Sequence, residues 1–107
     1  MLCIRPFQPD DAPSVAELIL SIQRQEFGVP ITLADQPDLQ AIEAFYQQGA
    51  GQFWVAFWEG TLVGTVALLD IGQRQGALRK MFVAASHRGG AFGVAPQLLA
   101  TLMDWAR

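Results

Sequence analysis

Apolar residues in the first half of the chain recur with the spacing of one short strand and two helices. The run Leu2 to Arg5 predicts a strand that ends at Pro6, because proline has no amide hydrogen for a sheet ladder. Asp10 and Asp11 can cap a helix whose apolar side chains recur at offsets of three, four and seven, at Val15, Leu18, Ile19 and Ile22. A second helix is predicted from Pro37 to Gly49, with one apolar face made by Leu39, Ile42, Phe45 and Tyr46.

The second half predicts three strands and a final helix. Residues 53–58 are uniformly apolar, which is typical of a strand buried on both faces, and Glu59-Gly60 forms a tight turn into a strand over 62–69. A polar loop over 72–76 precedes a strand over 77–84, and apolar residues at helical spacing follow within 94–107. The order βααβββα predicts a single domain over residues 1–107. Its class is α/β (α+β), with a mixed, largely antiparallel sheet.

Composition and charge exclude several classes of protein. Apolar residues make up 51% of the 107 residues and charged residues 16%, as in a globular domain, and no apolar run approaches the length of a membrane span. Cys3 is the one cysteine, so no intrachain disulfide forms, and we expect a reducing, cytoplasmic setting with Cys3 buried as a small hydrophobe. The net charge of −3 argues against nucleic acid as a partner.

The charge is unevenly distributed along the chain. Residues 1–70 carry nine acidic and two basic side chains, whereas residues 71–107 carry five basic side chains and one acidic one. A bound anion is therefore expected late in the chain. The glycine-rich stretch Arg88 to Gly93 lies there, between a predicted strand and a predicted helix, where free amides and the helix dipole favour a phosphate. A plain structural turn is the alternative, because most glycine-rich turns before helices bind nothing.

The stretch Leu78-Arg79-Lys80-Met81-Phe82-Val83, the following His87-Arg88-Gly89 and the element order together resemble the GNAT (Gcn5-related) N-acetyltransferases. That family carries the signature Gln/Arg-x-x-Gly-x-Gly/Ala. Arg88 matches its first position and Gly93 its last, whereas Ala91 stands where the family usually has glycine. The resemblance implies that acetyl-coenzyme A (acetyl-CoA) is the co-substrate. It also implies that the pantetheine arm pairs with the backbone of Met81, Phe82 and Val83, and that the pyrophosphate lies on the amides of Arg88, Gly89, Gly90, Ala91, Phe92, Gly93 and Val94.

The family normally continues with a fifth strand, a further helix and a terminal hairpin, so the resemblance implies an incomplete acyl-CoA N-acyltransferase fold. The tyrosine that often protonates the departing thiolate lies in that region, and we therefore assign no catalytic residue. Glu26, just after the first helix, is the candidate for the acceptor site, with an ordinary solvated glutamate as the alternative. One histidine and one cysteine make no metal set, and His87 is expected to be a simple loop residue. The aromatic residues at 46, 54, 57 and 58 are expected to form core.

Two functions follow from these expectations. The first is an acetyl-CoA-dependent N-acetyltransferase that acts on a small-molecule or protein amine. The second is a truncated, non-catalytic half-domain that binds coenzyme A or associates with itself. If the fourth strand ends the sheet, its unpaired edge can pair with another chain, and a homodimer or larger assembly is expected.

Overall fold

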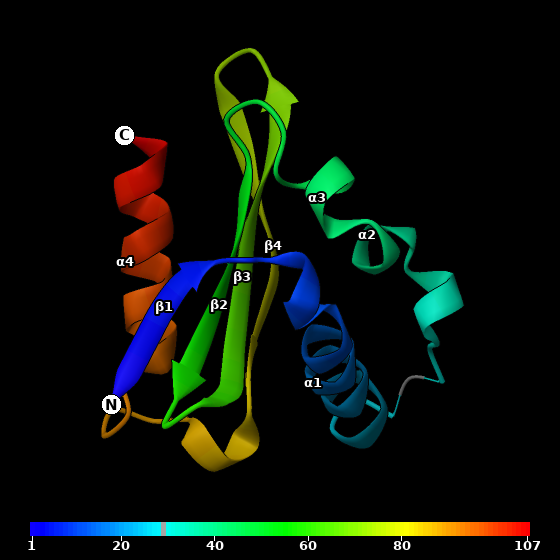
Figure 1. Ribbon diagram of the computed structural model, residues 1–107, viewed down its shortest axis with the longest axis vertical. Coiled ribbons are helices and arrows are strands. Elements are labelled where there is room, and N and C mark those ends of the chain that lie inside the picture. The colour runs from blue at the N-terminus through cyan, green and yellow to red at the C-terminus, as the bar shows by residue number, and fades with distance from the viewer. Residues whose placement is uncertain (29) are drawn as a thin grey trace.

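The computed structural model describes residues 1–28 and 30–107, which form a sheet between helices (Figure 1). The strands are β1 (Leu2–Pro6), β2 (Gln52–Trp58), β3 (Thr61–Gly72) and β4 (Gln75–Val83), paired antiparallel in the order β1-β2-β3-β4. The helices are α1 (Ala12–Gln25), α2 (Pro37–Gln40), α3 (Ile42–Phe45) and α4 (Val94–Ala106), with short 3-10 turns at Pro9–Asp11, Leu33–Asp35 and Ala85–His87. The predicted α/β class is confirmed. The sheet, predicted to be mixed and largely antiparallel, is antiparallel in all its described pairings, and β4 is an edge strand of it.

Helix α1 covers one face of the sheet. Its residues Val15, Ile19 and Ile22 are buried, as their helical spacing predicts. Val15 and Ile19 belong to an apolar cluster that also includes Phe53 and Val55 of β2. Because successive side chains of a strand point to opposite faces, this face receives alternate residues of β2.

Helix α4 covers the other face, as Figure 1 shows. Its residues Val94, Leu98 and Leu102 pack on Trp54 and Ala56 of β2 and on residues of β3. The predicted burial of β2 on both faces is therefore confirmed for residues 53–56. Gly64 of β3 lets α4 come close, because a Cβ atom there would lie 2.9 Å from Val94 Cγ1 and 3.0 Å from Leu98 Cδ1.

The predicted second helix is wrong in its extent, because the chain leaves helical geometry at Ala41 (φ −145°, ψ 56°) and forms α2 and α3 instead. The Tyr46 hydroxyl donates a hydrogen bond of 2.5 Å to Asp38 Oδ2. In one continuous helix these residues would be about 12 Å apart along the axis, so the break lets them meet. Phe45, predicted on the apolar face, is 45% exposed, whereas Leu39, Ile42 and Tyr46 are buried as expected.

Two smaller expectations also need correction. Cys3 is exposed, not buried, because strand alternation turns it away from the cluster that holds Leu2 and Ile4, and an edge strand is less covered than a central one. The loop predicted over 72–76 is shorter: β3 and β4 continue into it and leave a two-residue turn at Gln73 and Arg74, with φ of 57° and 62°. The other predicted turn, at Glu59-Gly60, is confirmed, with φ of 48° and 83°.

Asp11 joins β1 to α1, and its charge should stabilise the fold. The carboxylate accepts hydrogen bonds from Arg5 Nη1 and Nη2 (2.8 and 2.9 Å) and from the Gln8 amide (2.8 Å), and the residue is only 8% exposed. The hydrogen bond from Arg5 is the main cause that lowers the pKa of Asp11, with the Gln8 amide and the charge of Arg5 adding to it.

We therefore expect Asp11→Asn to lower the free energy of unfolding at pH 7 by about 1 to 2 kcal/mol, a value discounted for the solvent that reaches Arg5. A lowered folded pKa stabilises the protein above the ordinary aspartate pKa of about 4, and this stabilisation disappears as the pH falls through the folded pKa. Urea unfolding at pH 7 and below pH 3 measures the effect. The exposed Asp10→Asn is the control, and an equal loss in both variants at pH 7 would contradict the assignment.

Candidate functional site

The glycine-rich stretch is a turn that leads into α4, as the sequence predicts. Gly89 has a φ of 100°, and Gly93, which caps α4, has a φ of 67°. Both values lie in the left-handed region that glycine adopts without strain. Ala91 is not among the residues of positive φ, so the alanine at this position of the family signature imposes no backbone strain.

The main-chain amides of this turn divide into two groups. Those of Arg88, Phe92 and Gly93 donate to carbonyl oxygens of the protein at 3.3 to 3.5 Å. Within residues 1–28 and 30–107, the amides of Gly89, Gly90, Ala91, Val94 and Ala95 donate no hydrogen bond. Four of the seven amides predicted to hold a pyrophosphate thus donate no hydrogen bond within the described residues, and the same holds for one more in the first turn of α4. Free amides at the positive end of a helix dipole favour an anion.

A cavity of about 560 Å³ lies beside this turn. It brings together six of the ten residues predicted to bind the cofactor: Met81, Phe82, Val83, Arg88, Gly89 and Gly90. Ile22 and Phe27, from the end of α1 and just beyond it, close the opposite side. The other four predicted residues, Ala91 to Val94, do not line the cavity; Val94 is core, and the Phe92 ring packs on Trp58 at 5.1 Å.

The exposed edge of β4 contributes backbone groups to this cavity. The Ala84 amide donates to Val63 O at 2.7 Å, so Ala84 faces β3. Consecutive residues of a strand direct their amides and carbonyls to opposite sides, and Val83 therefore directs its amide and carbonyl to the unpaired edge. The Val83 carbonyl accepts Arg88 Nε at 2.8 Å. The Val83 amide is thus directed to the open edge, where a ligand can reach it.

Arg88 and Glu26, which we predicted for two different roles, form an ion pair with each other. Arg88 Nη1 and Nη2 lie 2.5 and 2.7 Å from Glu26 Oε1 and Oε2. The hydrogen bond from Arg88 lowers the pKa of Glu26, and the one to Glu26 raises the pKa of Arg88. The pair joins the end of α1 to the glycine-rich turn, and its two charges offset each other beside the cavity. The separation of 62 positions in the chain leaves no local sequence signal of this contact.

The remaining candidates from the sequence, His87 and Tyr46, pack or bond within the protein, and His87 also lines the cavity. The His87 ring packs on Trp58 and Phe92, and its Nδ1 lies 2.7 Å from Ser86 Oγ. Tyr46 is 1% exposed, and burial followed by the hydrogen bond to Asp38 raises its pKa far above the ordinary value. Its phenol is therefore neutral at any physiological pH. Lys80 was not among the site residues predicted from the sequence. The strand irregularity that directs its side chain inward has no signature in the alternation of apolar and polar residues.

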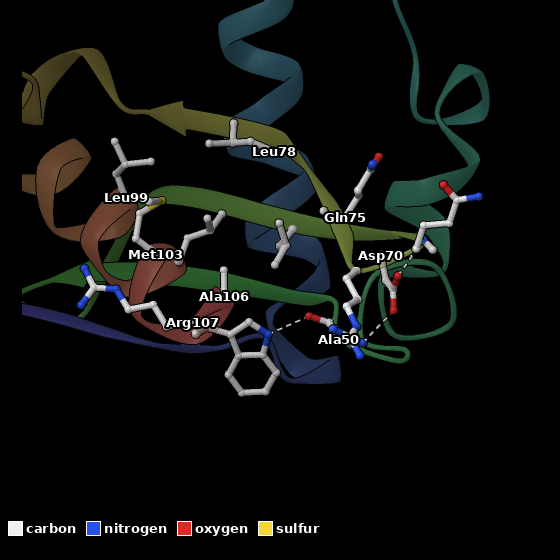
Figure 2. Close-up of a pocket in the computed structure, with 15 residues that line it drawn as sticks. Ala50, Asp70, Gln75, Leu78, Leu99, Met103, Ala106 and Arg107 are labelled. Carbon is white, nitrogen blue, oxygen red and sulfur yellow. Dashed lines mark hydrogen bonds between the residues drawn. The ribbon is translucent and has the colours of Figure 1, made fainter.

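A second cavity, of about 750 Å³, lies between the β3–β4 hairpin and the end of α4 (Figure 2). Leu78, Leu99, Met103 and Trp105 contribute to it and are each 40 to 50% exposed. Trp105 Nε1 donates to Ala50 O at 2.8 Å and so fixes one wall. None of the residues predicted to bind a ligand lines this second cavity.

Two further searches cover the described part of the chain. No helix there has the length and apolar character needed to cross a membrane. The same residues contain no group of three or more His, Cys, Asp or Glu side chains placed to hold a metal ion.

Comparisons with known proteins agree with this geometry. The family model described as "Acetyltransferase (GNAT) family" matches residues 16–107. The probable N-acetyltransferase family 8 member 5 of Mus musculus is 36% identical over 95 residues, which are 84% of this chain and 41% of that protein. A GNAT-family acetyltransferase structure from Staphylococcus aureus Mu50 superposes with a TM-score of 0.93 at 34% identity, over 99% of this chain and 66% of that one.

A more distant structure supports the fold alone. It is a predicted acetyltransferase with acetyl-CoA from Clostridium acetobutylicum, 17% identical, with a TM-score of 0.76 over 99% of this chain and 73% of that one. The chain thus spans less than half of the curated mouse relative and about two thirds of the staphylococcal structure. The matched family model, the curated relative and the superposed folds agree, and this chain belongs to the GNAT acetyltransferase family.

Proposed function

We propose that this chain binds acetyl-CoA in the cavity between β4 and the glycine-rich turn, as part of an N-acetyltransferase that acts on a primary amine. The observation that carries the proposal is the set of free amides at the start of α4, beside a cavity that the unpaired edge of β4 also lines. Membership of the family supports acetyl-CoA as the acetyl donor. The reducing, cytoplasmic setting expected from the single cysteine is part of the same proposal.

The turn is the proposed site of the pyrophosphate. The free amides of Gly89, Gly90, Ala91 and Val94 are the proposed donors, at the positive end of the α4 dipole. The remaining predicted residues, Arg88, Phe92 and Gly93, would shape this turn, since their own amides already bond within the protein. Both Nη atoms of Arg88 donate hydrogen bonds to Glu26. The main role that we assign to Arg88 is therefore to hold the turn against β4 and α1, and contact with phosphate is secondary.

The edge of β4 is the proposed site of the pantetheine arm. Met81, Phe82 and Val83 line the cavity, and the Val83 amide is directed into the open edge. A bound acetyl-CoA would supply a thioester, and an amide held near its carbonyl stabilises the negative charge that develops when an amine attacks. Glu26 stays our proposed residue for the acceptor site, because its carboxylate is bonded to Arg88, which lines the cavity. The proposal includes no general acid or base.

Two measurements test the proposal. Isothermal titration with coenzyme A tests the cavity, and thiol release from acetyl-CoA with a panel of small amines and lysine-containing peptides tests turnover. Saturable binding together with release in the presence of an amine is the expected result. Absence of coenzyme A binding would remove the proposal, whereas binding without release would favour the non-catalytic alternative.

A second candidate function is self-association, which the second cavity favours. The unpaired edge of β4 lies beside Leu78, Leu99 and Met103, and Figure 2 shows these side chains together at the cavity. Exposed strand edges pair with other chains, and an apolar groove beside the edge adds buried area. We propose a homodimer or larger assembly through this face. Sedimentation velocity over a range of concentrations tests it, and a monomer at all of them would exclude it.

A further inference from the structure

Lys80 lies in an irregular part of β4. Phe82 pairs with Thr65 and Arg79 with Ala67, so two residues of β4, Lys80 and Met81, stand opposite Val66 alone. This is a β-bulge, and Lys80 has a φ of 50°, which is unusual for a residue other than glycine. The fully buried Thr65 donates its hydroxyl to the Lys80 carbonyl at 2.7 Å, which holds the backbone in this conformation.

The Lys80 ammonium bonds to the segment that follows α1. Its Nζ lies 2.8 Å from Gln36 Oε1 and 3.4 Å from Asp38 Oδ2. The side chains of Lys80 and Asp38 are 18% and 13% exposed, so little water screens the pair. Tyr46 donates to the same oxygen of Asp38, and Gln36 exchanges two side-chain hydrogen bonds with Gln23 of α1, at 2.9 and 3.1 Å.

These contacts join elements that main-chain hydrogen bonds do not join. The described part of the segment between α1 and β2 contains one 3-10 turn of three residues and the two four-residue helices α2 and α3, and none of them pairs with the sheet. Short helices are marginal without tertiary contacts. Side chains therefore hold this segment in place, and Lys80 supplies the positive charge that links it to β4.

Two residues of the network are chain neighbours of residues that line the candidate cofactor cavity. Gln23 follows Ile22, and Lys80 precedes Met81; Ile22 and Met81 both line the cavity. A change in the distance between α1, the 36–46 segment and β4 would therefore change the width of the cavity. No side-chain polar atom buried in the described structure lacks a hydrogen-bond partner, so the network is fully satisfied as it stands.

We propose that Lys80 is a positioning residue: its ammonium holds the 36–46 segment against β4 and fixes the width of the cleft in which the acceptor amine meets the thioester. The effect on the width of the cleft rests on the function proposed above. The attachment of the 36–46 segment to β4 does not. Removing the ammonium leaves the Asp38 carboxylate largely buried with Tyr46 as its remaining partner, and a buried charge without its counter-ion destabilises its surroundings.

The test uses hydrogen exchange in the 107-residue chain. In Lys80→Met, which keeps the length of the side chain but removes its charge, amides of residues 33–46 are expected to exchange about tenfold faster or more, because a hydrogen bond to a charged group is lost. Lys80→Arg restores the charge and should restore slow exchange. The control is Arg79→Met, at an exposed neighbour whose guanidinium bonds only to the Leu78 carbonyl among the described residues. Wild-type exchange rates in Lys80→Met would overturn the proposal.

Coenzyme A titration separates this inference from the proposed function. Lys80→Met is expected to bind coenzyme A more weakly than the wild type, because Lys80 precedes Met81 of the cavity wall, and Lys80→Arg is expected to recover the affinity. With any amine that the wild type acetylates, KM for the amine should rise about tenfold in Lys80→Met and recover in Lys80→Arg. A wild type that fails to bind coenzyme A removes the proposed function alone, whereas binding with unchanged exchange at 33–46 removes the role of Lys80.

A second variant keeps the test decisive if Lys80→Met does not fold. Asp38→Asn removes the opposite charge with almost no change in volume and leaves the Tyr46 hydroxyl an acceptor. It should also accelerate exchange at 33–46, and the Asp38→Asn, Lys80→Met double variant should lose less protection than the sum of the two single variants. Full additivity would show that the two side chains act independently. It would overturn the proposal that Lys80 holds the 36–46 segment through Asp38.

Discussion

Replacing Phe53 with alanine is expected to lower the free energy of unfolding by about 3 to 5 kcal/mol. Phe53 is fully buried at the centre of the cluster under α1, and its ring packs on Phe7 and Tyr46 with centroids 5.7 and 5.5 Å apart. The substitution removes these ring contacts and leaves a cavity that the rigid β2 backbone cannot close. Since domains of this size are stable by only about 5 to 15 kcal/mol, a large part of the stability is lost. Urea unfolding followed by tryptophan fluorescence measures the change.

Phe45→Ala is the matched control, because the same side chain is removed next to the same tyrosine. Phe45 is 45% exposed, and its ring lies 4.9 Å from that of Tyr46. We expect a loss below about 1 kcal/mol, which corresponds to one aromatic contact with little burial. A comparable loss in the two variants would contradict the arrangement of α3, since it would place both rings in the core.

The elements that the sequence predicts well are those whose pattern is local. Val15, Ile19 and Ile22 recur at helical spacing and are all buried in α1. The apolar run of β2 is typical of a strand covered on both faces, and residues 53–56 are buried together in the structure. The two-residue turn at Glu59-Gly60 follows from Gly60, which accepts its φ of 83° without strain. In each case the neighbours in the chain decide the outcome.

The features that escape prediction depend on side-chain contacts and on sheet position, which local periodicity does not encode. The break at Ala41 is coupled to the contact between Asp38 and Tyr46, and the bulge at Lys80 is coupled to Thr65 on β3 and Gln36 on the opposite side. Cys3 is exposed because β1 happens to be an edge strand, which is a property of the whole sheet. No periodicity within a short window contains this information.

The candidate site shows the same division. The glycine spacing predicts a turn before a helix, and the structure has one at Arg88 to Gly93. Which amides of that turn remain free depends on the contacts that fold it, and Arg88, Phe92 and Gly93 use theirs internally. The ion pair of Arg88 with Glu26 depends on where α1 ends relative to the turn. The sequence therefore locates the site, whereas the donors and their charge come from the tertiary structure.

Replacing Gly90 with valine is expected to weaken coenzyme A binding about tenfold or more without destabilising the fold. Gly90 lines the cavity, its φ is not in the left-handed region, and a Cβ atom there would meet nothing within 4 Å. The added side chain therefore fits the protein but occupies the space in front of the free amides of Gly89 and Ala91, where the diphosphate is proposed to lie.

Titration calorimetry with coenzyme A and thermal unfolding measure the two expected results of Gly90→Val separately. Ala100→Val, which adds the same side-chain bulk at an exposed position of α4, should bind coenzyme A like the wild type. Gly89→Val should lose both affinity and stability, because its φ of 100° strains any residue with a side chain. The three variants thus separate steric exclusion of the ligand from distortion of the turn. Wild-type affinity in Gly90→Val would place the diphosphate elsewhere, since no phosphate can share the volume of the two added methyl groups.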